Sequence, residues 1–167
     1  AGATGTGKTY ASAFAMKNEQ PGKALFIVHR ELIAKQAKSS YLRVFENSKK
    51  LGLLSGSSKE YDADILFATM STMAKEDTLN KYCPDEFEWI CIDEVHRAGA
   101  ESYKKIMDYF KPEFWFGMTA SPERTDGFDI FKLFDHNIAY EIRLQHALKE
   151  DLLCPFHYFG ITDIEIN

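Results

Sequence analysis

Short apolar runs alternate along the chain with longer amphipathic stretches, and this alternation predicts the order of strands and helices. An uninterrupted apolar run is typical of a parallel strand that is buried on both faces, and such runs occupy residues 23–29, 64–69, 89–93 and 114–118. The stretches between them favour helices over residues 9–17, 30–45, 71–79 and 102–110. Leu51, Leu53 and Leu54 interrupt the polar segment 46–58 and predict one further short strand.

Strands that alternate with helices call for a parallel α/β sheet with right-handed crossovers. In the helix 30–45 we expect one buried face, formed by Ile33, Ala37, Tyr41 and Val44. Residues 144–153 also predict a helix, which Pro155 ends, and residues 156–167 end in a strand-like pattern. The predicted organisation is one domain over residues 1–153 and a connecting segment over residues 154–167.

Composition and charge narrow the class of protein. With 167 residues, 45% of them hydrophobic and 27% charged, the chain has the make-up of an ordinary globular domain. Its net charge of −5 argues against a module that binds nucleic acid by bulk charge, but does not exclude local basic contacts. Three cysteines without C-x-x-C spacing favour reduced thiols and a cytoplasmic location. No apolar run approaches the length of a membrane span, so we expect no membrane partner.

The first nine residues contain the most specific motif, because Gly2 to Thr9 reads G-x-x-x-x-G-K-T. This is the phosphate-binding loop of nucleoside triphosphatases, whose backbone N–H groups surround the phosphates. The glycines allow the close approach of backbone that a Cβ would block. We expect Lys8 to contact the β- and γ-phosphates and Thr9 to bind Mg²⁺. The nucleotide-binding residues are then Ala3, Thr4, Gly5, Thr6, Gly7, Lys8 and Thr9.

A second polar motif, Asp93-Glu94-Val95-His96, follows the apolar run 89–93. The carboxyl ends of parallel strands are where ligands of open α/β folds bind. We expect Asp93 to hold Mg²⁺ and Glu94 to polarise the water that attacks the γ-phosphate, so that both act in catalysis together with Lys8. A solvated acidic turn is the alternative. The phosphate loop upstream favours the catalytic interpretation, because two motifs in the expected order are more specific than either alone.

Asp93-Glu94-Val95-His96 resembles the DExH box of superfamily 2 helicases, and the resemblance covers nearly the whole chain. Val28–Gln36 is similar to motif Ia of that family, and Thr69–Thr72 to the threonine-bearing motif at the next strand end. Gly117–Arg124 resembles motif III, although Ser121-Pro122 stands where many members have Thr-Pro; the hydroxyl is kept. The continuation through Asp126-Gly127 resembles the branch of restriction-enzyme motor subunits and related bacterial DNA helicases.

The resemblance implies a RecA-like P-loop NTPase fold, a three-layer sandwich with a mostly parallel sheet. It implies the first motor lobe of an ATP-dependent DNA helicase or translocase, with ATP and Mg²⁺ as cofactors and a second RecA-like lobe as partner. An RNA helicase lobe is the alternative, because only contacts to the 2′-hydroxyl separate the two tracks. A nucleotide-dependent switch that does not translocate is a third alternative, against which motifs Ia and III speak.

The family motifs also assign secondary roles. Arg30 and the start of its helix are expected to contact the nucleic-acid backbone. Thr69, Ser71 and Thr72 are expected to offer hydroxyls to the same backbone, unless each serves only as a helix cap.

Motif III is expected to link the nucleotide state of the site to the contact with nucleic acid. His96 would bridge the nucleotide site to Thr119 or Ser121, since a neutral imidazole can donate with one nitrogen and accept with the other. An ordinary histidine in a turn is the alternative.

The chain begins inside the phosphate loop, so we expect a fragment. The strand before the loop is expected to lie beside the strand that carries Asp93. Because second-lobe arginines complete such sites, the isolated chain is expected to bind nucleotide poorly and to be nearly inactive, the activity residing in the full-length protein.

Overall fold

The computed structural model describes residues 6–93 and 101–118. Helices and strands alternate through these residues in the order α1 (Thr6–Glu19), β1 (Ala24–Val28), α2 (Glu31–Phe45), β2 (Leu51–Leu54), β3 (Ile65–Thr69), α3 (Met70–Met73), α4 (Glu76–Leu79), β4 (Trp89–Asp93), α5 (Glu101–Tyr109) and β5 (Phe114–Met118). The strands form one sheet in the order β2-β3-β1-β4-β5, and every pair is parallel. The predicted parallel α/β architecture is confirmed.

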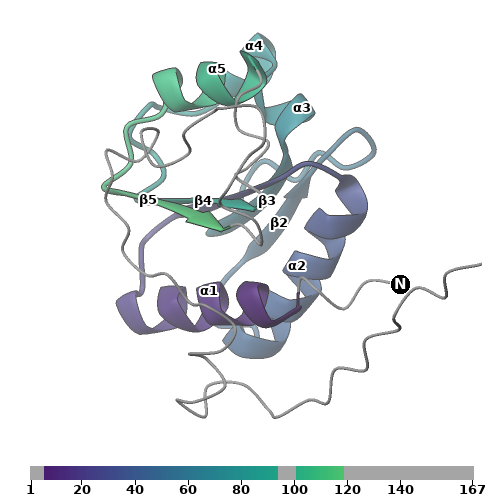
Figure 1. Ribbon diagram of the computed structural model, residues 1–167, viewed down its shortest axis with the longest axis vertical. Helices are drawn as coiled ribbons and strands as arrows, with labels where there is room; N and C mark the ends of the chain where they lie inside the picture. Colours follow the sequence, from purple (N-terminus) through teal and green to yellow (C-terminus); the bar gives the residue numbers. More distant parts are fainter. Residues whose placement is uncertain (1–5, 94–100, 119–167) are drawn as a thin grey trace, which may run out of the picture. The chain divides into compact units, whose positions relative to one another are not determined.

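Helices cover both faces of this sheet, which makes three layers (Figure 1). α1 and α2 lie on one face, and α3, α4 and α5 lie on the other. The central strand β1 shows why its sequence is apolar throughout. Ala24, Phe26 and Val28 face α1 and α2, whereas Leu25 and Ile27 face the opposite helices, so all five residues are buried.

An aromatic cluster fills the core beneath α2. The Tyr41 ring meets Phe26 and Phe67 of the sheet edge-on, with centroid distances of 5.6 and 5.0 Å, and stacks on Phe45 of its own helix at 5.9 Å. Edge-to-face pairs of this kind add to the stabilisation from burial alone. The predicted buried face of α2 is wrong at one position: Ile33 is exposed, and Ala34 is buried instead. A small side chain lets this end of α2 approach the sheet closely.

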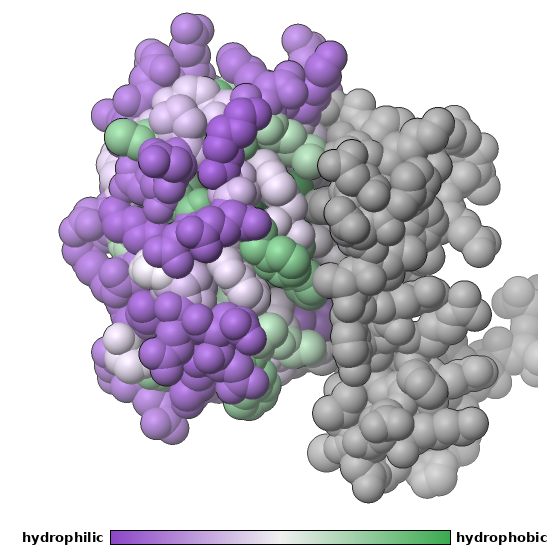
Figure 2. All heavy atoms as spheres, turned by 90° about the vertical axis from the view of Figure 1, so that its left-hand side faces the viewer, coloured by the Kyte–Doolittle hydropathy of each residue, from purple (hydrophilic) through white to green (hydrophobic). Residues whose placement is uncertain are grey.

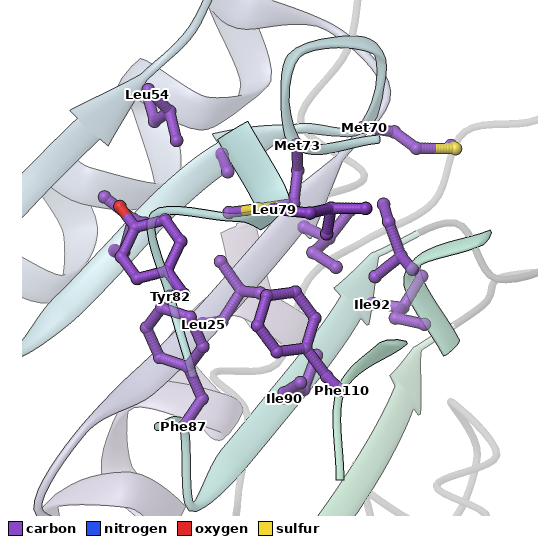
Figure 3. Packing of buried hydrophobic residues seen from close by; sticks show 14 of the residues in the cluster. Leu25, Leu54, Met70, Met73, Leu79, Tyr82, Phe87, Ile90, Ile92 and Phe110 are labelled. Atoms are coloured by element: carbon purple, nitrogen blue, oxygen red, sulfur yellow. The ribbon is translucent and has the colours of Figure 1, made fainter. Parts of the chain in front are cut away.

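The second core lies under α3, α4 and α5 (Figure 3). Its largest buried side chains include Phe87 and Phe110, whose rings meet edge-on at 5.4 Å. Leu25 and Ile90 close this core from the sheet side. The two cores together bury every apolar side chain of β1 and β3, whereas Phe114, Trp115 and Phe116 of β5 are only half-buried.

The helix predicted over residues 71–79 is two short helices. α3 ends at Met73, and Lys75 has an extended backbone (φ −70°, ψ 135°) before α4 begins. Met70 and Leu79 are both buried in the second core. With 3.6 residues per turn, these two would lie on opposite sides of one continuous helix. The break therefore turns both towards the same core.

The two sides of β4 are both occupied, by β1 and by β5. The expectation that a strand preceding the phosphate loop lies beside β4 is therefore wrong, because a strand has only two edges to pair. Among the described strands, β2 and β5 are the edges of the sheet.

The segment after β2 folds back over the outer side of that strand. Lys59 forms an antiparallel bridge with Leu54, and the Glu60 carboxylate accepts the Leu53 N–H at 2.6 Å. Covering an edge strand in this way removes a site for unwanted strand pairing. Gly52 of β2 lies so close to this segment that an added Cβ would come within 2.7 Å of the Ala63 Cβ.

The side of the molecule on the left of Figure 1 is covered mostly by hydrophilic residues, and its apolar areas are small and separate (Figure 2). In the part of the chain that the structure describes, no helix has the length and apolar character needed to cross a membrane. The predicted helix 144–153, the predicted strand 156–167 and the boundary at residue 153 lie outside the described residues.

Candidate functional site

Four parallel strands end in one row across the sheet. Val28 of β1 pairs with Thr69 of β3, and Asp93 of β4 pairs with Met118 of β5. Because Ile27 pairs with Ile92, Asp93 continues the row next to Val28. The described residues of four predicted motifs thus leave the sheet at the same edge, where ligands of such folds bind.

The end of the phosphate loop forms the first turn of α1. Gly7 is exposed, Lys8 is half-buried, and Thr9 is buried, with 8% of its surface exposed. This turn has no acidic residue, so nothing in it opposes the positive end of the helix dipole. A helix start of this kind favours an anion. Thr6 begins the helix, while Ala3, Thr4 and Gly5 lie outside the described residues.

Asp93 is the last residue of β4 and is buried, with 7% of its surface exposed. Burial, and secondarily the negative charge of Asp93, raise the pKa of the Cys91 thiol, so this cysteine stays protonated. The charge of Asp93 also contributes to raising the pKa of Tyr41. The carboxylate therefore acts on the layer between β4 and α2. Glu94 and His96 lie outside the described residues, as do Thr119 and Ser121.

Thr9 is linked to α2 by two hydroxyl groups. The Ser12 hydroxyl donates to the Thr9 carbonyl oxygen at 2.7 Å, and the Ser12 and Tyr41 oxygens lie 2.8 Å apart. Ser12 thus joins the backbone of Thr9 on α1 to the Tyr41 hydroxyl on α2. Oxygen donors such as the Thr9 hydroxyl and the Asp93 carboxylate are the ligands that Mg²⁺ prefers, so these residues fit such an ion.

Arg30 lies at the N-cap of α2 with an extended backbone (φ −126°, ψ 143°), and its side chain is exposed and makes no cap hydrogen bond. The next residue, Glu31, has its pKa lowered to about 2, chiefly by a hydrogen bond from Lys35 and then by one from Ser57. The Lys35 Nζ and Glu31 Oε1 atoms lie 2.7 Å apart. Because Glu31 is already paired, its charge opposes an anion at the start of α2 less than a lone carboxylate would.

The three hydroxyl residues after β3 have different surroundings. Thr69 and Thr72 are buried, and the Thr69 hydroxyl donates to that of Thr72 at 2.9 Å. Ser71 is exposed. Thr69 occupies the N-cap position of α3 but makes no side-chain cap bond, so the simple capping alternative does not describe it. Only Ser71 has its side chain at the surface in this arrangement.

Sequence reasoning gave Tyr41 a packing role only and gave Ser12 none. A serine among the alanines of α1 was the available signal, because a buried hydroxyl needs a partner. Which partner it finds depends on how α1 and α2 pack, and the sequence alone does not specify that.

The sequence of this chain matches restriction-enzyme subunits and helicases among known proteins. The family model described as the Res subunit of type III restriction enzymes matches residues 1–124. A type I restriction enzyme EcoAI endonuclease subunit from Escherichia coli is 28% identical over 177 residues, covering 99% of this chain and 21% of that protein. The putative ATP-dependent helicase IRC3 from Saccharomyces cerevisiae is 28% identical over 148 residues, covering 83% and 21%.

Among solved structures, a hypothetical ATP-dependent RNA helicase from Sulfolobus tokodaii superposes with a TM-score of 0.68 at 20% identity, covering 84% of this chain and 45% of that one. This likeness confirms the RecA-like helicase fold. The chain spans 21% of the length of each of the two curated relatives.

Proposed function

Because the chain belongs to the family of the Res subunit of type III restriction enzymes, we propose that it is the first motor lobe of an ATP-dependent DNA helicase or translocase. The strongest support is the arrangement at the carboxyl edge of the sheet. Lys8 and Thr9 lie in the first turn of α1, Asp93 is the buried last residue of β4, and β4 ends in the same row as its neighbours β1 and β5.

In this proposal each residue has one task. Lys8 and the N–H groups at the start of α1 bind the phosphates of ATP. The Thr9 hydroxyl and the Asp93 carboxylate hold Mg²⁺, which when bound neutralises charge that develops on the phosphates. Glu94 orients the attacking water and accepts its proton. Arg30 and Ser71, both exposed, contact sugar and phosphate.

DNA is proposed as the track because a restriction endonuclease subunit matches nearly the entire chain. RNA is the second candidate, since the solved structure from Sulfolobus tokodaii is called an RNA helicase. The remaining coupling residues, His96, Thr119 and Ser121, are proposed to carry nucleotide state to this track. The second RecA-like lobe of the full-length protein would complete the site.

The test is the ATPase rate of the full-length protein without nucleic acid and with duplex DNA, single-stranded DNA or RNA. We expect stimulation by DNA. Lys8→Ala should abolish ATP binding, because the phosphates lose their main side-chain partner, whereas Lys104→Ala on the exposed side of α5 should not. Stimulation by RNA alone would show that the protein moves on RNA and not on DNA. ATP binding without stimulation by either nucleic acid would favour a nucleotide-dependent switch that does not translocate. Equal ATP affinity in Lys8→Ala and wild type would refute a nucleotide site here.

A further inference from the structure

We propose that Tyr41 and Ser12 are positioning residues that couple nucleotide occupancy at Lys8 and Thr9 to helix α2, and through α2 to the nucleic acid. The inference rests on the proposed function and adds two residues that lie outside the motifs.

The two hydroxyls form a hydrogen-bond chain with a fixed direction. Ser12 has one hydroxyl proton, and it is donated to the Thr9 carbonyl at 2.7 Å. The contact of 2.8 Å between Ser12 and Tyr41 must therefore use the proton of the tyrosine. The chain runs from Tyr41 on α2 through Ser12 to Thr9, the residue whose side chain is proposed to hold Mg²⁺.

Packing of the surrounding side chains holds the hydrogen bonds from Tyr41 through Ser12 to Thr9 in place. Tyr41 is fully buried and Ser12 keeps 2% of its exposure. The Tyr41 ring is held between Phe26, Phe45 and Phe67, so its hydroxyl cannot move away from Ser12 without disturbing the core. Burial also raises the pKa of Tyr41 well above its usual value, so the hydroxyl keeps the proton that it donates.

The other described polar contacts between α1 and α2 are nearer the surface. Lys17 donates to the Val44 carbonyl at 2.8 Å in a half-buried position, and Arg43 donates to the Tyr10 hydroxyl at 3.3 Å in an exposed one. The bond between Tyr41 and Ser12 is buried between the two helices. A displacement of the first turn of α1 towards or away from a nucleotide must therefore either carry α2 with it or strain this bond.

α2 carries the proposed nucleic-acid contact at its start, where Arg30 lies exposed. A shift of α2 changes the position of Arg30 relative to the backbone that it contacts. Coupling between two binding sites is reciprocal, so each ligand must change the affinity for the other by the same factor. The two directions must therefore give the same factor in every variant, which checks the measurement itself. A bond that carries coupling changes this factor when it is removed, whereas a residue needed only for stability leaves the factor unchanged.

The experiment measures both directions in the full-length protein. The Kd of a non-hydrolysable ATP analogue with Mg²⁺ is determined with and without duplex DNA, and the Kd of DNA with and without the analogue. Tyr41→Phe keeps the ring and removes only the hydroxyl. We expect it to reduce the coupling factor roughly two- to tenfold, the range for one neutral hydrogen bond, and equally in both directions.

Tyr109→Phe is the matched control, because the Tyr109 hydroxyl likewise donates one hydrogen bond, here to the Tyr82 carbonyl oxygen at 2.7 Å, but on the opposite face of the sheet. It should leave the coupling factor unchanged. Ser12→Ala combined with Tyr41→Phe should match Tyr41→Phe alone, since both residues belong to one chain of bonds.

An unchanged coupling factor in Tyr41→Phe, or a wild type that binds both ligands without coupling, would overturn the inference and leave the proposed function intact. A wild type that binds no nucleotide would overturn both. An equal loss in Tyr109→Phe would make the effect one of general stability and would also overturn the inference.

Discussion

Replacing Ser12 by alanine should destabilise the lobe more than replacing Tyr41 by phenylalanine, although the serine is the smaller side chain. Tyr41→Phe removes one neutral hydrogen bond and leaves the ring packing and the bond from Ser12 to Thr9 in place. The expected cost is about 0.5–1.5 kcal/mol. Ser12→Ala removes both bonds and leaves the Tyr41 hydroxyl, which is fully buried, without its hydrogen bond to Ser12.

A buried hydroxyl without a partner costs about 1–3 kcal/mol, and the lost bond from Ser12 to Thr9 adds about 0.5–1.5 kcal/mol of its own. The better helix propensity of alanine returns only about 0.5 kcal/mol. Because the second change removes the stranded hydroxyl, the double variant Ser12→Ala with Tyr41→Phe should be more stable than Ser12→Ala alone. The expected difference is about 1 kcal/mol, and it is the signature of a coupled pair.

Hydrogen–deuterium exchange of the full-length protein measures this difference within the lobe. The amides of β1, the central strand, report the free energy of opening the sheet. A difference of about 1.4 kcal/mol changes their exchange rate tenfold. Exchange of β1 should be fastest in Ser12→Ala and slower in the double variant. Costs that add, with the double variant exchanging fastest, would refute the hydrogen-bond chain.

Three further predictions follow from other parts of the lobe. Gly52→Ala should destabilise it by about 1–3 kcal/mol, because an added Cβ has no room beside the segment that covers β2; exchange of β2 and β3 measures this. The hydrogen bond from Lys23 lowers the pKa of Glu86 below its usual 4.5, so the stability from this pair is present above pH 4.5 and lost as the pH falls through the lower folded value. The loss of stability caused by Lys23→Gln, measured by exchange at pH 7 and near pH 3, should therefore shrink at the lower pH; an equal loss at both would contradict it. Thr119→Ala with Ser121→Ala should reduce strand displacement more than basal ATPase activity, and a parallel loss of both would assign these residues to the active site or to packing.

Four strands of this lobe could be predicted from the sequence because each is an uninterrupted apolar run between polar segments. The runs 23–29, 64–69, 89–93 and 114–118 correspond to β1, β3, β4 and β5 within a residue or so. The order of the strands could not be predicted in the same way. Nothing in the run 114–118 indicates that it pairs with β4, at the edge where we expect the strand that precedes the phosphate loop.

In the candidate site, too, the sequence predicts the positions of residues along the chain but not their contacts. The positions of Lys8, Thr9 and Asp93 at element ends follow from motif spacing and from the end of an apolar run. The hydrogen bond between Thr69 and Thr72, by contrast, depends on the backbone path from β3 into α3 and leaves no trace in residue type. Contacts between separate elements were therefore the part that sequence reasoning missed.

In the proposed hydrolysis of ATP, Glu94 is the residue that activates water, and Glu94→Gln in the full-length protein removes this capacity while keeping the size of the side chain. The measurement pairs the ATP affinity with the steady-state rate of hydrolysis in the presence of DNA. We expect unchanged affinity and a rate lower by roughly 10²–10⁴-fold, the range for losing a positioned general base. Glu101→Gln, an exposed change at the start of α5, is the control and should alter neither quantity. Full hydrolysis by Glu94→Gln would contradict the account.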